Sequence, residues 1–233
     1  MNIIAKKGEK KVFYTELSYI FGVIAIALGT AMIAVSEIGV AMPVVSAHVI
    51  HGLLHDLHWV TLGMVEIACQ VVLFVVLAIV CREIKKAFFI SMATGVIYSI
   101  LLDLFIILCE LLPHALIVRI ALFAVGLVVL ALGEILLHHT YIQSEFYEFF
   151  IHELTERFKL RFYKVKFIFE ATLCLIGVVI SFAFHGVGEV HGLGIGTVVC
   201  ALLLVPMSHA FGKLLTKNHA FVDRFKAREF FRD

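Results

Sequence analysis

Apolar residues fill six long stretches of this 233-residue chain, and short polar segments separate them. Each stretch holds roughly 20 apolar residues, the length that an α-helix needs to cross a hydrocarbon core of about 30 Å. The backbone must satisfy its own hydrogen bonds in lipid, and these stretches are too long for barrel strands, so the pattern predicts helices. We expect membrane-spanning helices near residues 17–36, 59–80, 88–109, 115–137, 164–184 and 192–213.

Two amphipathic segments interrupt this pattern, one after the first predicted span and one after the fourth. The first, about 38–58, contains Pro43 and a run rich in histidine. The second, about 140–162, carries an apolar stripe at helical spacing, and Ser144 is a candidate N-cap for it. We expect both segments to be helices that lie at the membrane surface.

The distribution of charge predicts how the chain is oriented in the membrane. All but one of the 19 lysines and arginines fall in segments that lie on the same side of a six-span arrangement, and the exception is Arg119. Basic flanks mark the cytoplasmic side, so both termini are expected in the cytoplasm. A net charge of +1 with this distribution gives no indication of nucleic-acid binding.

Composition agrees with a membrane protein and narrows the chemistry. The chain is 62% hydrophobic and 16% charged, which separates it from ordinary soluble proteins. No cleavable signal peptide is recognisable, and the five cysteines are interpreted as small apolar residues because none forms a C-x-x-C pair. The sequence has no nucleotide-binding, haem or nucleophile motif, so we expect no enzymatic activity and no cofactor apart from a candidate divalent metal such as zinc.

A shift of 104 residues places unusual residues of the second half on their counterparts in the first. The coincident pairs are Gly22 with Gly126, Gly29 with Gly133, His48 with His152, and Glu66 with Glu170. The glycines lie on one helix face and favour close packing between the first and fourth spans. Each half holds three spans, an odd number, so the two copies cross the membrane in opposite directions.

We therefore predict an all-α membrane protein with a single domain, residues 1–233. It consists of two inverted three-helix repeats, each with an amphipathic connector helix. The first repeat covers about 12–112 and the second about 113–216, and 217–233 form a partly helical cytoplasmic tail. Inverted repeats recur in transporters, where the substrate binds near the midplane between the copies.

Ionisable residues inside the predicted spans are the main candidates for function, because a charge is costly in lipid. They form two groups related by the repeat, with Glu66 and Asp103 toward the outer face and Glu170, Ser208 and His209 toward the inner face. The structural alternative is that they hold helices together, and Lys166 lies one turn before Glu170 and could pair with it. Three further residues lie nearer the span ends and are interpreted as structural: Glu110, Arg119 and Glu134.

Gly194, Gly196 and Thr197 open the sixth predicted span. Glycines at this place permit a close-packed helix start or a flexible gate. The alternative is direct contact with substrate, because backbone amides at a helix N-terminus can meet an anion.

Four histidines of the first connector are spaced three, four and three residues apart: His48, His51, His55 and His58. On a continuous helix this spacing would place all four imidazoles on one face, where pairs of them could bind zinc. A pH-sensitive interface or an ordinary polar helix face are the alternatives.

Several short motifs resemble the YczE/YitT-like bacterial integral membrane proteins. They are A-x-x-L-G at 25–29, Gly39, Asp103, V-K-x-x-x-E at 165–170 and G-x-G-T at 194–197. The resemblance covers roughly residues 15–215 and implies a multi-pass protein of the bacterial inner membrane with a transport role. It supplies no substrate, and the histidine-rich connector departs from the family pattern.

The sequence thus predicts a secondary transporter of a small solute, coupled to protons or cations through Glu66 and Glu170. Its expected partners are the lipid bilayer and a small-molecule or ion substrate, and a homodimer is left open. The alternative is a non-transporting binding, accessory or sensor protein that holds metal through its outer histidines. A membrane enzyme acting on lipid is disfavoured because no catalytic pair is evident.

Overall fold

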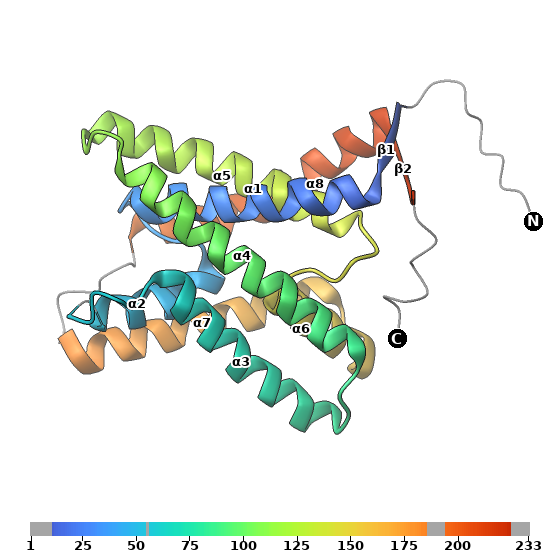
Figure 1. Ribbon diagram of the computed structural model, residues 1–233, viewed down its shortest axis with the longest axis horizontal. Coiled ribbons are helices and arrows are strands. Elements are labelled where there is room, and N and C mark those ends of the chain that lie inside the picture. The colour runs from blue at the N-terminus through green and yellow to red at the C-terminus, as the bar shows by residue number, and fades with distance from the viewer. Residues whose placement is uncertain (1–10, 55, 186–193, 225–233) are drawn as a thin grey trace, which may run out of the picture.

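The computed structural model describes residues 11–54, 56–185 and 194–224, and six long helices dominate these ranges (Figure 1). Each of the six is long and apolar enough to cross a membrane, which indicates a multi-pass membrane protein. They are α1 Thr15–Val35, α3 Leu62–Cys81, α4 Lys86–Glu110, α5 Leu116–His138, α7 Phe162–His185 and α8 Ile195–Asn218. The predicted spans coincide with these helices, and the largest difference is at the end of α8.

The segment after α1 turns back into the bundle before its helices begin. It forms the short 3-10 helix η1 Met42–Val44 and then α2 Val45–Leu53. Val45 packs against Gly177, where an added Cβ atom would come within 2.7 Å of the valine side chain. Gly177 lies eight residues before the end of α7, about 12 Å inside at about 1.5 Å per residue. α2 therefore begins inside the bundle.

The segment after α5 also turns back into the bundle, before α6 Phe146–Phe158. Ser91 donates a hydrogen bond to the carbonyl of Ser144 (2.7 Å), and Thr94 donates one to the carbonyl of Gln143 (3.0 Å). The two donors lie five and eight residues into α4, about 8–12 Å from its start. Both connectors are helices, as predicted, but the prediction that they lie at the membrane surface is wrong because each begins inside the bundle.

Two strands join the ends of the described chain. β1 Lys11–Tyr14 and β2 His219–Val222 pair as a parallel sheet, and Thr15 Oγ1 donates a hydrogen bond to Asp223 Oδ1 at 2.9 Å. We call this end of the bundle the sheet end and the opposite one the far end (Figure 1). The all-α prediction missed this sheet, because its strands pair across more than 200 residues. The tail begins as helix, as predicted, because α8 reaches Asn218; β2 then follows, and residues 225–233 lie outside the described residues.

The expected N-cap of α6 is also corrected. Glu145 occupies the N-cap position, and no side chain caps the helix there. Ser144 lies one residue earlier and its carbonyl accepts the hydrogen bond from Ser91. Tertiary contacts thus set the start of this helix.

α1 and α5 cross at the centre of the bundle with almost no space between their backbones. A Cβ atom added to Gly29 would come within 2.6 Å of the backbone nitrogen of Leu130, and one added to Gly133 within 2.7 Å of the backbone nitrogen of Ile26. Small residues allow such close approach, which stabilises helix pairs in lipid through packing. The predicted packing of the first span against the fourth is confirmed, and the two helices are antiparallel.

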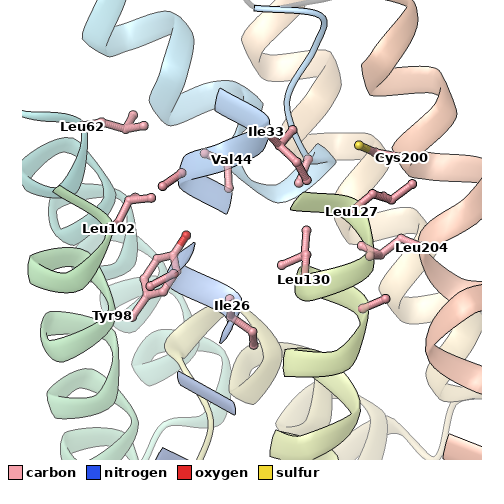
Figure 2. Close-up of a cluster of buried hydrophobic side chains, with 14 of the residues drawn as sticks. Ile26, Ile33, Val44, Leu62, Tyr98, Leu102, Leu127, Leu130, Cys200 and Leu204 are labelled. Atoms are coloured by element: carbon pink, nitrogen blue, oxygen red, sulfur yellow. The ribbon is translucent and has the colours of Figure 1, made fainter. Parts of the chain in front are cut away.

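An apolar core surrounds this crossing (Figure 2). The side chains labelled there come from six elements: Ile26 and Ile33 of α1, Val44 of η1, Leu62 of α3, Tyr98 and Leu102 of α4, Leu127 and Leu130 of α5, and Cys200 and Leu204 of α8. Large apolar side chains also cover the outside of the bundle, among them Val72, Ile79 and Ile100. A surface of this kind suits contact with lipid.

Candidate functional site

A cavity of about 70 Å³ lies where the two inward-turning segments meet, and we call it the central cavity. The first segment contributes Pro43 and Val44, and the second contributes Ser144 and Glu145. The connector helix α6 and the spanning helices α1, α4, α5, α7 and α8 supply most of the remaining walls. Its polar and ionisable lining residues are Thr30, Tyr98, Glu134, His138, Ser144, Glu145, Tyr147, Glu148, His152, Lys166 and Glu170.

Lys166 is the main positive charge of this cavity. Its Nζ lies 3.5 Å from Glu134, 3.3 Å from Glu148 and 3.7 Å from Glu170. Ser208 of α8 adds a hydrogen bond of 2.9 Å to Glu134. Both Lys166 and Glu170 are buried, and a buried ion is tolerated only with partners of this kind. The expected pairing of Lys166 with Glu170 is therefore confirmed, and it belongs to a larger group of carboxylates.

Glu66 occupies a separate polar site beside the central cavity. Its side chain is fully enclosed, and neither carboxylate oxygen has a hydrogen-bond partner among the described residues. The Tyr147 hydroxyl of α6 lies next to it, and Gln70 and Ser99 are also buried with side-chain atoms that have no partner in the described part of the chain. Buried polar atoms without partners are rare, so this group calls for a functional explanation.

Glu145 connects these two sites. It lines the central cavity, and its Oε2 atom is enclosed without a hydrogen-bond partner within the described ranges. Burial, and then the charges of Glu66, Glu148 and Glu134, raise the pKa of Glu145 from 4.5 to about 8, against the opposing effect of Lys166. Glu145 can therefore take up and release a proton near neutral pH.

This raised pKa predicts that the folded protein loses stability as pH rises. The folded state keeps the Glu145 proton up to about pH 8, whereas the unfolded chain releases it near 4.5. Between these values the folded state binds more protons, so the free energy of unfolding falls as pH increases. Glu145→Gln should flatten the decline in melting temperature across this window, measured by scanning fluorimetry in detergent.

A matched variant is available on the same helix. Glu156 is exposed on α6, so Glu156→Gln should keep the wild-type slope. An unchanged slope in Glu145→Gln would contradict the assignment of the proton to Glu145.

Asp103 lies toward the far end, as Glu66 does, and makes contacts of its own. Its carboxylate accepts hydrogen bonds from Thr61 Oγ1 at 2.6 Å and from the backbone nitrogen of Gly63 at 2.7 Å. These contacts hold the start of α3. Asp103 also lines a larger cavity of about 730 Å³ at the far end, the far cavity, together with Glu37 and Glu110.

The predicted histidine face is not formed. α2 ends at Leu53, so His48 and His51 lie on it whereas His58 follows in irregular structure, and His55 is outside the described residues. His48 and His51 line the far cavity. In the described part of the chain, no three His, Cys, Asp or Glu side chains are grouped so that they could hold a metal ion.

The glycines that open α8 pack against the segment that follows α1. The Gly196 nitrogen donates to the Ile38 carbonyl at 3.1 Å, and the Val40 nitrogen donates to Thr197 Oγ1 at 3.1 Å. A Cβ atom added to Gly194 would clash with the Ile38 carbonyl oxygen, and Gly194 also lines the far cavity. These contacts favour the close-packed helix start over direct contact with substrate.

His209 lines a third cavity of about 310 Å³, the sheet-end cavity, with Ser208. This cavity and the central cavity share four wall residues, Glu134, His138, Glu148 and Lys166. The predicted group of Glu170, Ser208 and His209 is thus divided between two adjoining cavities, and Ser208 binds Glu134.

Sequence reasoning missed most of the polar residues of the central cavity, including Glu134, Glu145, Tyr147 and Glu148. Glu134 was interpreted as structural, and Glu145, Tyr147 and Glu148 lie in a connector that was expected at the surface. One signal pointed to Glu134: it is a carboxylate inside an apolar stretch, and Lys166 offered a counter-charge in another span.

A comparison with known families gives one match. The family of unknown function DUF6198 matches residues 13–213, from β1 into the last turns of α8. The chain belongs to this family. No curated protein and no solved structure matches it. The matched range therefore includes every element that lines the central cavity, and the family description assigns none of them a role.

Proposed function

We propose that this protein is a secondary transporter of a small solute, coupled to protons or cations through its intramembrane carboxylates. The observation that carries the proposal is the central cavity, where Lys166 and several glutamates are enclosed between spanning helices. Ionisable groups inside a membrane domain are costly and mark ion or substrate pathways. Segments that break off inside the bilayer and begin a helix there are typical of transporter binding sites.

An inverted repeat is part of this proposal, and the contacts between α1 and α5 support it. Added Cβ atoms at the four paired glycines would meet Leu137 from Gly22, Leu130 from Gly29, Ile33 from Gly126 and Ile26 from Gly133. If each glycine is moved forward by 104 residues and its partner back by 104, the contact of Gly22 with Leu137 becomes that of Gly126 with Ile33. In the same way, the contact of Gly29 with Leu130 becomes that of Gly133 with Ile26. Such exchange is expected when a two-fold axis passes between two related helices.

The order of elements supports the same arrangement. α1 is followed by a short inward-starting helix, α2, and two spans, and α5 is followed by α6 and two spans. In transporters built this way, the site lies between the repeats and rocking exposes it to one side at a time. The central cavity adjoins the sheet-end cavity, whereas it shares no wall residue with the far cavity as described. We assign the structure to a state that opens toward the sheet end.

Orientation and location follow from the same proposal. The basic flanks support a cytoplasmic sheet end by the positive-inside rule. The resemblance to YczE/YitT-like proteins implies the bacterial inner membrane. Labelling of single cysteines at the two ends of the bundle in intact cells tests the orientation, and membrane fractionation tests the location.

Flux through reconstituted vesicles tests the function directly. Vesicles that contain a pH indicator are exposed to a panel of small ammonium ions, carboxylates, sugars, amino acids and phosphates. We expect proton movement that depends on one class of solute, and we expect its loss in Glu66→Gln and Glu170→Gln, because each removes a buried carboxylate. Glu156→Gln, which changes an exposed carboxylate, should retain wild-type flux.

Folded protein without flux for any solute would contradict transport and favour the binding, accessory or sensor role. Wild-type flux in both buried variants would remove Glu66 and Glu170 from the mechanism. Circular dichroism and size-exclusion chromatography of each variant separate loss of function from loss of fold.

A further inference from the structure

We propose that the central cavity binds a small organic cation, such as a guanidinium or a short primary ammonium ion, and exchanges it for protons on the same carboxylates. This inference rests on the proposed transport function and adds the chemical class of the solute.

The balance of charge around the cavity is the first argument. Its acidic lining residues are Glu134, Glu145, Glu148 and Glu170, and Lys166 is the lysine among the described wall residues. The first turns of α2 and α6 add positive partial charge, about half an elementary charge for each helix. With all carboxylates ionised, the described wall keeps a net charge of about −2. His138 and His152 add positive charge only when they are protonated. Such a cavity attracts cations and repels anions.

Polar atoms without partners are the second argument, and they are independent of the charge. The Oε2 atom of Glu145 is enclosed and has no hydrogen-bond partner in the described ranges. Tyr147 is 3% exposed and lines the cavity, and its hydroxyl lies beside the Glu66 carboxylate without a hydrogen bond of normal geometry. A carboxylate oxygen accepts hydrogen bonds only, and a tyrosine oxygen can accept one. A ligand rich in N–H donors would satisfy the Glu145 oxygen and could also donate to the Tyr147 oxygen, whereas an anion would leave an ionised Glu145 unsatisfied.

The size of the cavity limits the solute. One water molecule needs about 10–15 Å³ measured in this way, so 70 Å³ corresponds to roughly five water-sized groups. Guanidinium has four heavy atoms and methylammonium has two, and both fit within this limit. A larger amine would require the cavity to widen toward the sheet-end cavity.

Exchange follows from competition for the same oxygens. When the cation binds, the carboxyl group releases its proton, and the resulting carboxylate accepts an N–H hydrogen bond from the ammonium or guanidinium ion. One proton leaves for each cation that binds, so charge is conserved. Glu145 is suited to this step because burial and its neighbours raise its pKa to about 8. The described groups that face it are Glu66 of α3, Tyr98 of α4, Glu134 of α5, Glu148 of α6 and Lys166 of α7.

Calorimetric titration of the detergent-solubilised full chain with guanidinium chloride tests the inference. Titrations at the same pH in phosphate and in HEPES, neither of which is a primary ammonium ion, reveal proton release, because the two buffers take up a proton with different heats. We expect binding of guanidinium and of methylammonium with release of protons. Urea, the neutral analogue of guanidinium, and acetate should not bind.

Glu145→Gln should weaken guanidinium binding by about tenfold or more, the loss expected for one charge-assisted hydrogen bond, and should reduce the difference between buffers. Glu156→Gln on the same helix should leave both unchanged. Binding of urea or acetate in place of guanidinium, an absence of guanidinium binding, or equal heats in both buffers would each overturn the inference.

The proposal of transport and the proposal of a cation site would fail with different results. Guanidinium binding with proton release but without flux in vesicles would preserve this site and contradict transport. Flux of a neutral or anionic solute without guanidinium binding would preserve transport and contradict this site.

Discussion

Replacing Lys166 with methionine is expected to destabilise the folded protein by about 3–5 kcal/mol, because removing one partner of a buried ion pair leaves uncompensated charge. Lys166 holds Glu134, Glu148 and Glu170 at 3.3–3.7 Å, and each of them would lose its nearest positive charge. The measurement is the melting temperature in detergent. Lower pH should restore part of the loss, since protonated carboxyl groups need no counter-charge.

Lys164 provides the matched control for this variant. It lies on the same helix two residues earlier and is exposed, so Lys164→Met removes an equal charge from a solvated position. Its melting temperature should stay close to that of the wild type, because exposed ion pairs contribute little. Equal melting temperatures for the two methionine variants would show that the glutamates do not depend on Lys166.

Gly29→Ala is expected to cost about 2–3 kcal/mol, because it adds a methyl group where there is no space. The new Cβ atom would come within 2.6 Å of the Leu130 nitrogen and within 2.8 Å of the Gly126 carbonyl oxygen. These atoms belong to the backbone of α5 and cannot rotate away as a side chain would. α1 and α5 would have to separate along their length, and the yield of folded protein should fall together with its melting temperature.

Gly52→Ala is the control for this substitution. Gly52 lies on α2, and no atom approaches within 4 Å of an added Cβ there. Alanine is a better helix former than glycine, so this variant should be as stable as the wild type or slightly more stable. A Gly29→Ala variant as stable as Gly52→Ala would contradict the close crossing of α1 and α5.

The sequence predicted the spanning helices well, because the hydrocarbon thickness imposes a length on each apolar stretch. It could not predict how deep the connectors lie. An amphipathic pattern such as the one after Ser144 describes which face of a helix is apolar, and it is the same whether that face meets lipid or protein. Contacts of Ser91 and Thr94 with the chain before α6 decide the depth, and they join residues about 50 positions apart.

The candidate site was predicted only in part for a similar reason. Lys166 and Glu170 are one helical turn apart, so their pairing follows from local spacing. Glu134 and Glu148 reach Lys166 from two other helices, and no local rule links them. The histidine face failed because α2 ends at Leu53, after Gly52, a weak helix former in its last turn.

The pairing of β1 with β2 brings the two ends of the described chain together. The first and last described segments are hydrogen-bonded neighbours, and the loop between α4 and α5 joins the two halves at the opposite end of the bundle. The backbone thus traces a nearly closed circuit. Proteins whose ends meet tolerate circular permutation. A gene that encodes the second half first, with a short linker at the strands and new ends near Pro113, would specify the same set of helix contacts.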